Sequence, residues 1–418
     1  MLNLKLIPTK EENMPTIEAT IGGKKIYLYS KYDPNRDTLA FAESIYNEET
    51  KDYLIYGIGL GYHIDALVDL IHRDDYHIYV FECNKDIFKL AHDNLEKIMN
   101  NKNITVVVMG NDKEYYDKLN KVLSIDDISI GIHRPSLTII PEEFKELKYL
   151  LEEFVMTKNT MESTSNILDE NFKSNIKYFD GNVDRLFDKF RGRPIYIVSA
   201  GPSLDKNIQE LAKVKNKGLI LSVGRAAKPL LSVGIVPDFI ILTDPSKHLY
   251  NSQLRGLDID VSLIVLSTAD KNIMMNYKGK KYITLQEGYP PAEEYGKANN
   301  HKLVRTGGSV ATTALDVAIR MGCNPIVFVG QDLGFTDNKS HSSKTYSRRI
   351  FESQGLRDVE DIYGNTIQTS KNLYIYLRWI QNRIAEETGI EFIDATEGGA
   401  RIRGTKVMRL KEVIDTRL

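Results

Sequence analysis

Residues at one strand end in the second half of the chain suit the binding of an anion. A predicted strand, 195–199, runs into a turn containing Gly201, Pro202 and Ser203, and a helix is expected from Leu204. Gly201 permits a tight bend, Pro202 suits a first helical turn, and Ser203 brings a hydroxyl next to helix N-terminal amides. Such a turn can hold a phosphate through those amides and the positive helix end. An ordinary capped helix explains the same residues equally well.

Three further motifs favour the binding alternative. Gly224 and Arg225 follow the predicted strand 218–223, and Asp244 follows the strand 238–243. A third motif opens a helix that runs to about residue 321, and it consists of Thr306, Gly307, Gly308 and Ser309. Because parallel strands end at one edge of a sheet, we expect these residues around one cleft that binds a nucleotide-linked anion. Arg225 would neutralise phosphate and Asp244 would hold a ribose hydroxyl, although each motif alone also has a purely structural explanation.

Asp332 and His341 are the candidates for acid–base chemistry. Asp332 follows the predicted strand 325–329, and His341 lies in the polar loop after it. Histidine is suited to removing a proton near neutral pH, but a histidine in a polar loop is more often simply solvated. Asp332 alternatively orients the loop. Glu397 lies in a turn that either closes the same cleft or connects an edge strand. The other histidines lack the spacing of metal ligands, so no metal site is predicted.

The order of predicted elements supplies the sheets that these motifs need. Strands alternate with helices and short connections in two regions, separated by a charged stretch with helical spacing. We therefore predict an α/β fold with two Rossmann-like parallel-sheet units, a helical connector and a helical C-terminal region. The expected divisions are 1–140 for the N-terminal domain, 141–190 for the connector, 191–345 for the Rossmann-like core and 346–418 for the mostly helical region that completes the cleft.

The first unit carries a glycine loop of its own, Gly57 to Gly61, after the predicted strand 53–56. Glu82 ends the next strand, where a carboxylate that binds ribose would lie. This order resembles a methyltransferase or dinucleotide-binding fold. A tight turn without any cofactor is at least as good an explanation, because Tyr62 and His63 crowd the loop. We therefore expect neither S-adenosylmethionine nor a nucleotide there, and no required cofactor.

Composition excludes several classes of protein. The 418 residues suggest two or three domains, and 42% hydrophobic with 27% charged residues is typical of globular chains. The formal net charge of −2 argues against a general nucleic-acid partner. Two cysteines and no long apolar stretch predict a cytoplasmic protein without an integral membrane segment. An oligomer is compatible with these features.

The second unit resembles the motility accessory factor (Maf) family of flagellin glycosyltransferases. The resemblance covers about residues 193–405 and rests on the motifs given above, in the same order, together with Gly330-Gln-Asp-Leu-Gly-Phe335. That core is in turn similar to bacterial sialyltransferases that use CMP-sialic acid. Ser199 and Ala200 stand where those enzymes have Gly and Asn, so an Asn contact to the donor is missing.

The resemblance implies transfer of a nonulosonic acid, such as pseudaminic or legionaminic acid, from its CMP form to Ser or Thr of flagellin. It implies donor binding by the residues around the cleft and deprotonation of the acceptor hydroxyl, for which His341 is the candidate. Two alternatives stay open. Pterin-alcohol pyrophosphokinases share a related core, and a non-catalytic flagellin-binding accessory protein would keep the loops without the chemistry.

Overall fold

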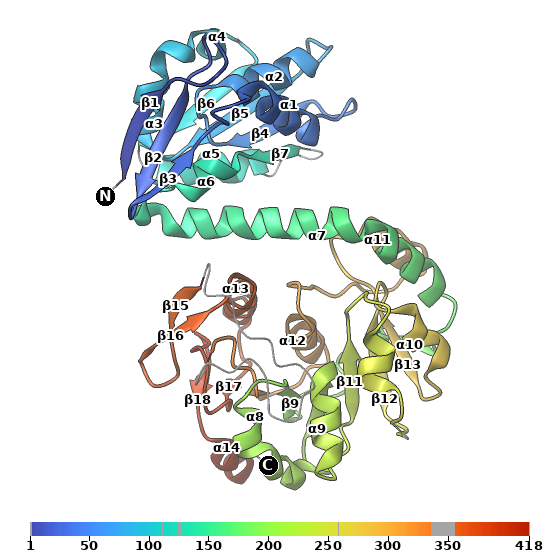
Figure 1. Ribbon diagram of the computed structural model, residues 1–418. Helices are drawn as coiled ribbons and strands as arrows, with labels where there is room; N and C mark the ends of the chain where they lie inside the picture. Colours follow the sequence, from blue (N-terminus) through green and yellow to red (C-terminus); the bar gives the residue numbers. More distant parts are fainter. Residues whose placement is uncertain are drawn as a thin grey trace. The chain divides into compact units, whose positions relative to one another are not determined.

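The computed structural model describes residues 2–335 and 356–417, apart from positions 111, 124, 126, 127 and 258. The chain forms two compact units, Met1–Thr160 and Met161–Leu418 (Figure 1). The helix α7, Lys145–Asn175, crosses the division between them. Its Leu147 and Leu151 pack in the core of the first unit, whereas its Phe172 packs with Leu285 of the second.

The first unit is built on a four-stranded parallel sheet with the strand order β6-β5-β4-β7. The predicted strand 53–56 and the next strand, which was expected to end at Glu82, are present as β4 and β5. A separate antiparallel sheet of three strands, β1 to β3, and the strand β7 were not predicted. The bounds are β1 Asn3–Ile7, β2 Thr16–Ile21, β3 Lys24–Tyr27, β4 Asp52–Tyr56, β5 His77–Glu82, β6 Ile104–Val108, β7 Ser129–Ile132, α1 Pro34–Ile45, α2 Tyr62–Leu70, α3 Lys85–Ala91, α4 Glu96–Met99, α5 Asp112–Leu123 and α6 Arg134–Thr138.

The second unit contains a nine-stranded parallel sheet with the order β18-β17-β14-β9-β10-β11-β12-β13-β8. Its strands are β8 Gly181–Asn182, β9 Ile195–Val198, β10 Leu219–Val223, β11 Phe239–Leu242, β12 Ser262–Leu266, β13 Lys281–Thr284, β14 Ile326–Val329, β17 Phe392–Asp394 and β18 Lys406–Val407. The helices are α8 Leu204–Asn207, α9 Ala227–Ser232, α10 Lys271–Asn276, α11 Pro290–Ala298, α12 Val310–Arg320, α13 Lys371–Ala385 and α14 Leu410–Arg417. The region after residue 356 thus adds two strands to this sheet, and it also forms the antiparallel hairpin of β15 Arg357–Glu360 and β16 Thr366–Thr369.

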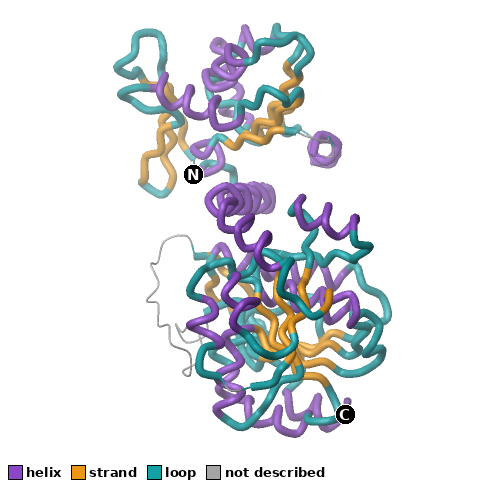
Figure 2. The backbone as a smooth tube through the Cα atoms, turned by 90° about the vertical axis from the view of Figure 1, so that its right-hand side faces the viewer, coloured by secondary structure: helices purple, strands orange, loops and turns teal. Residues whose placement is uncertain are grey.

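Helices cover both faces of the large sheet (Figure 2). The central strands are buried throughout, which is why they read as continuous apolar runs in the sequence. In β9, Ile195 packs in the cluster that includes Leu315 of α12 and Leu377 of α13. Its neighbour Tyr196 packs in the opposite cluster, with residues of α8, α9 and α14. The predicted α/β fold with two Rossmann-like units is therefore confirmed.

Candidate functional site

A cavity of about 730 Å³ opens at the carboxyl ends of the central strands of the second unit. Loops after β9, β10, β11 and β14 line it together with the first turns of α12 and α13, and its volume suits a small-molecule ligand. The predicted site residues that line it are Gly201, Gly224, Arg225, Asp244, Gly308, Ser309 and Asp332. The predicted residues that do not line it are Pro202, Ser203, Leu204, Thr306, Gly307 and Glu397. His341 lies outside the described residues.

Asp332 is buried in the wall of this cavity and ties two loops together. Its carboxylate accepts the Ser203 hydroxyl at 2.7 Å and the Ser203 N–H at 3.3 Å. A Cβ at Gly201 would lie 1.8 Å from Asp332 Oδ2, so glycine alone lets the loops approach this closely. Burial raises the pKa of Asp332 to about 6, against the lowering effect of the Ser203 hydrogen bonds. The group can therefore gain or lose a proton just below neutral pH.

The loop after β9 does not offer the free amides expected of a phosphate cradle. The α-helix α8 has only 4 residues and continues as the 3-10 helix Ile208–Val214. The Ser203 N–H already donates a hydrogen bond to Asp332, and the Leu204 N–H donates one to Gly201 O at 3.1 Å. Pro202 has no backbone N–H. A carboxylate of the chain itself thus accepts the N–H that was expected to meet an external anion, which favours the alternative of an ordinary structural turn.

Arg225 and Asp244 lie at the ends of the neighbouring strands β10 and β11, and both are exposed. Asp244 Oδ1 accepts the Ser246 N–H at 2.8 Å, which fixes the carboxylate in its turn. Gly224 contacts the side chain of Gln253 so closely that a Cβ would lie 2.1 Å from Gln253 Oε1. Two neighbouring strand ends therefore bring a cationic and an anionic side chain to the cavity lining, and together these can meet a phosphate and a hydroxyl.

The first turn of α12 forms another wall. Ser309 is its N-cap, and Ser309 and Thr312 cap each other reciprocally. The Gly307 N–H donates a hydrogen bond to Thr312 Oγ1 at 3.0 Å. A Cβ at Gly307 would lie 2.4 Å from the Trp379 ring. Gly307 therefore lets α13 pack closely, while Gly308 and Ser309 face the cavity. The start of this 11-residue helix places partial positive charge at the cavity wall.

Glu397 holds the turn behind Asp332 rather than lining the cavity. Its Oε1 accepts the side-chain amide of Asn207 and the Leu410 N–H, each at 3.1 Å. A Cβ at Gly399 would lie 2.2 Å from Asp332 O, so this turn packs directly against the loop after β14. The turn that contains Glu397 thus fixes the cavity wall from behind.

Sequence reasoning did not assign several polar residues that line the cavity to the site, among them Gln253, Gln331 and Tyr376. Tyr376 lies within a helical pattern that does not show which face is turned to a ligand, and only the placement of α13 reveals that this residue reaches the cavity. Gln331 was passed over because a neutral amide beside an aspartate carries no chemical signal of its own.

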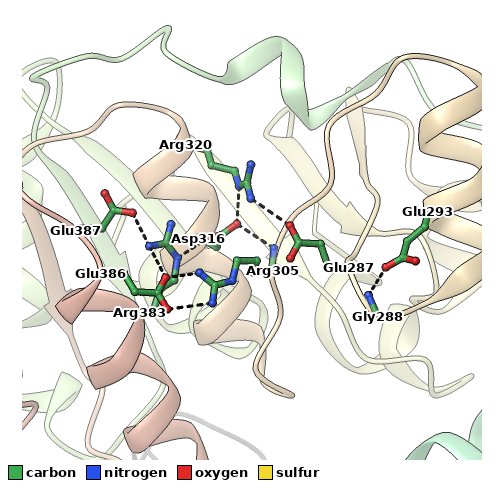
Figure 3. Close-up of polar contacts among 9 residues, drawn as sticks. All are labelled: Glu287, Gly288, Glu293, Arg305, Asp316, Arg320, Arg383, Glu386 and Glu387. Carbon is green, nitrogen blue, oxygen red and sulfur yellow. Dashed lines mark hydrogen bonds and ion pairs between the residues drawn. The ribbon is translucent and has the colours of Figure 1, made fainter. Parts of the chain in front are cut away.

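A network of charges joins the two helices that line the cavity (Figure 3). Asp316 of α12 is fully buried and accepts Arg320 Nε at 2.7 Å and Arg383 Nε at 2.8 Å. Arg383 belongs to α13 and is itself largely buried. Because α12 carries Ser309 and α13 carries Tyr376, the network fixes the positions of two cavity walls relative to each other.

The glycine loop of the first unit is covered by side chains of the chain itself. A Cβ at Gly59 would lie 2.4 Å from the Tyr29 hydroxyl, and one at Gly61 would lie 2.4 Å from Ile98 Cδ1. The Tyr29 hydroxyl accepts the Leu60 N–H at 3.1 Å. The backbone that would approach a cofactor in a dinucleotide-binding fold therefore contacts protein instead.

Glu82, in the position of a ribose-binding carboxylate, is also used within the fold. It accepts the Ile58 N–H at 3.1 Å and the Asn84 N–H at 2.8 Å. It is 1% exposed, and burial raises its pKa to about 7. Its hydrogen bonds hold the glycine loop against the end of β5.

Within ranges 2–335 and 356–417, no group of three or more His, Cys, Asp or Glu side chains is arranged to hold a metal ion. No helix in the same part of the chain combines the length and the apolar character needed to cross a bilayer.

The fold is that of an α/β protein with a cavity at the carboxyl edge of a parallel sheet. The family model described as 6-hydroxymethylpterin diphosphokinase MptE-like matches residues 168–338. The chain is 28% identical over 206 residues to 6-hydroxymethyl-7,8-dihydropterin pyrophosphokinase of Methanocaldococcus jannaschii, a match that covers 47% of this chain and 79% of that protein.

A solved structure is similar over nearly the whole chain. It is the Maf glycosyltransferase from Magnetospirillum magneticum AMB-1, with a TM-score of 0.53 and 15% sequence identity. The similarity covers 97% of this chain and 70% of that one. The predicted resemblance to the Maf family is therefore confirmed as a shared fold, and it extends to both units.

Proposed function

We propose that the chain is a glycosyltransferase that moves a nonulosonic acid from its CMP form to Ser or Thr of flagellin. The observation that carries the proposal is the cavity at the carboxyl edge of the large sheet, where Arg225, Asp244 and the start of α12 meet. Similarity of fold to a Maf glycosyltransferase over 97% of the chain supports this reaction class. The motifs of the second unit, in the order typical of the Maf family, support the donor and acceptor.

The proposed roles follow from the charges around the cavity. As CMP leaves, the anomeric carbon of the donor becomes electron-poor and negative charge grows on the departing phosphate. Arg225 and the start of α12, with Gly308 and Ser309, would stabilise that charge electrostatically. Asp244 would hold a ribose hydroxyl, and His341 would remove the proton of the acceptor hydroxyl. A CMP leaving group has a single phosphate, so the proposal requires no metal.

Of the two roles expected for Asp332, we favour the orientation of a loop over acid–base chemistry. Because its carboxylate holds Ser203, it fixes the loop after β9. Its pKa of about 6 also leaves it partly protonated just below neutral pH, which reduces its repulsion of an anionic donor. We therefore assign Asp332 to shaping the donor site and His341 to the proton transfer.

A pterin-alcohol pyrophosphokinase is the second candidate, and a specific finding favours it. The family model and the 28% identical relative both cover the core of the second unit. Neither covers the whole chain, whereas the Maf fold includes the first unit and the region after residue 356. The architecture therefore favours the transferase.

One pair of assays separates the two candidates. The purified chain is incubated with CMP-pseudaminic or CMP-legionaminic acid and flagellin, and separately with ATP, magnesium and the pterin alcohol. Release of CMP together with a matching mass increase on flagellin supports the transferase. Release of AMP in the second reaction, without sugar transfer in the first, would contradict the transferase and support the pyrophosphokinase.

A further inference from the structure

The loops after β9 and β14 meet where the strand order of the large sheet changes direction. The chain proceeds from β9 through β10 to β13 on one side and then returns as β14 on the other side of β9. Such a switch in direction opens a crevice outside the strand ends, which is where α/β sheets bind ligands. Ser199 follows β9, and its N–H donates a hydrogen bond to Val329 O of β14 at 2.8 Å. Ser199 therefore lies at this crevice.

A side-chain hydrogen bond spans the crevice. The Ser199 hydroxyl donates to Gln331 Oε1 at 2.6 Å, and both residues line the cavity. Gln331 is 8% exposed and Ser199 is 7% exposed. The Gln331 N–H also lies 3.4 Å from Thr396 Oγ1, so both the backbone and the carbonyl end of the side chain are fixed. Its amide NH2 makes no hydrogen bond with any residue that the structure describes.

A second serine–glutamine pair at the same edge of the sheet provides an internal comparison. The Ser267 hydroxyl donates to Gln286 Oε1 at 2.7 Å. There, however, the Gln286 NH2 donates to Thr268 Oγ1 at 3.0 Å, so the amide is satisfied at both ends. This second pair does not line the cavity. Gln331 lines the cavity and its NH2 is not among the fully buried atoms, so this donor is open to a ligand in the cavity.

We propose that Gln331 is a binding residue whose amide NH2 donates a hydrogen bond to an acceptor atom of the bound nucleotide, and that Ser199 is the positioning residue that holds the amide in this orientation. The inference rests on the proposed function, because it takes the nucleotide to be cytidylate. The acceptor is an oxygen or nitrogen of the base, ribose or phosphate.

The test measures the dissociation constant of CMP by calorimetry for the full chain and its variants. Gln331→Ala is expected to weaken CMP binding about threefold to tenfold, the loss of one neutral hydrogen bond. Gln331→Glu should weaken it more, because it places a carboxylate opposite an acceptor. Ser199→Ala should weaken CMP binding about threefold. Ser199→Thr keeps the hydroxyl and should bind CMP with the affinity of the parent. Ser267→Ala is the matched control and should leave CMP binding unchanged.

The double variant tests the positioning role. If Ser199 acts through Gln331, Ser199→Ala should have no further effect in a Gln331→Ala background. Additive effects would remove Ser199 from this role. Affinity within a factor of two of the parent in both Gln331 variants would overturn the inference, and full affinity in Gln331→Glu alone would overturn the donor assignment. Thermal unfolding of each variant identifies any that misfold, and the remaining variants then decide.

Two further arms locate the acceptor and separate this inference from the proposed function. If the Gln331 variants bind both cytidine and CMP more weakly than the parent does, the acceptor is on the nucleoside. If they bind only CMP more weakly, the acceptor is on the phosphate. If the parent protein binds CMP normally and the variants match it, the inference fails alone. If the parent does not bind CMP, the proposed donor fails and the inference falls with it.

Discussion

The charge network between α12 and α13 supports a quantitative prediction about stability. Arg383→Met removes a guanidinium that is 8% exposed at its side chain, from a partner, Asp316, that is fully buried. Methionine keeps much of the apolar volume, so the main change is electrostatic. Breaking one side of a buried ion pair costs about 3–5 kcal/mol, because a charge is left without compensation.

The structure places the cost at the lower end of that range. Asp316 keeps the hydrogen bonds from Arg320 Nε and from the Arg305 N–H at 3.0 Å. We therefore expect a loss of about 3 kcal/mol in the free energy of unfolding of the second unit. For a unit of this size, that loss corresponds to a Tm lower by roughly 6–12 °C.

The assay is thermal unfolding followed by circular dichroism, with an exposed ion pair as the control. Arg191 pairs with Asp188, and their side chains are 78% and 63% exposed. Arg191→Met should therefore cost less than about 1 kcal/mol. Adding Asp316→Asn to Arg383→Met should recover part of the loss, because a neutral amide then replaces a buried carboxylate that has lost one of its two cationic partners. Equal Tm changes for Arg383→Met and Arg191→Met would refute the reasoning.

Three further predictions concern the cavity and its chemistry. His341→Ala should abolish most sugar transfer while CMP-sugar binding persists, and transfer at the parental rate would remove His341 from the mechanism. Gly201→Ala should destabilise the second unit by about 1–3 kcal/mol in urea unfolding, because its Cβ would lie 1.8 Å from Asp332 Oδ2. Gly398→Ala, whose Cβ would have its nearest contacts at 3.5 Å, is the matched control and should change little. Because the pKa of Asp332 is raised to about 6, the folded state keeps a proton that the unfolded state loses between about pH 4 and 6. The parent should therefore gain roughly 2 kcal/mol relative to Asp332→Asn between pH 7 and pH 4, and a constant difference between the two would contradict this.

The central sheet and the position of the cavity could be predicted because their signals are local. Buried parallel strands such as β9 and β14 read as short apolar runs, and glycine or polar residues follow each of them. The alternation of such strands with helices then implies that their ends share one edge.

Details of the cavity walls depend on residues far apart in the sequence, so local patterns could not predict them. The carboxylate of Asp332, 129 positions from Ser203, takes the amide that was expected to bind a phosphate. The helix α8 is short, and the side chain of its last residue, Asn207, bonds Ala395 O at 3.0 Å. The strand β1 was missed because its residues are mostly exposed and lack an apolar run.

The central claim is tested most directly by the mass of flagellin. Flagellin is produced in cells that make a CMP-nonulosonate, with and without this chain, and its intact mass and modified peptides are measured. The account predicts added nonulosonic acid residues on Ser or Thr only when the chain is present, with much less addition when Arg225→Ala replaces the parent. Flagellin of the same mass in the presence and absence of the chain would contradict the account.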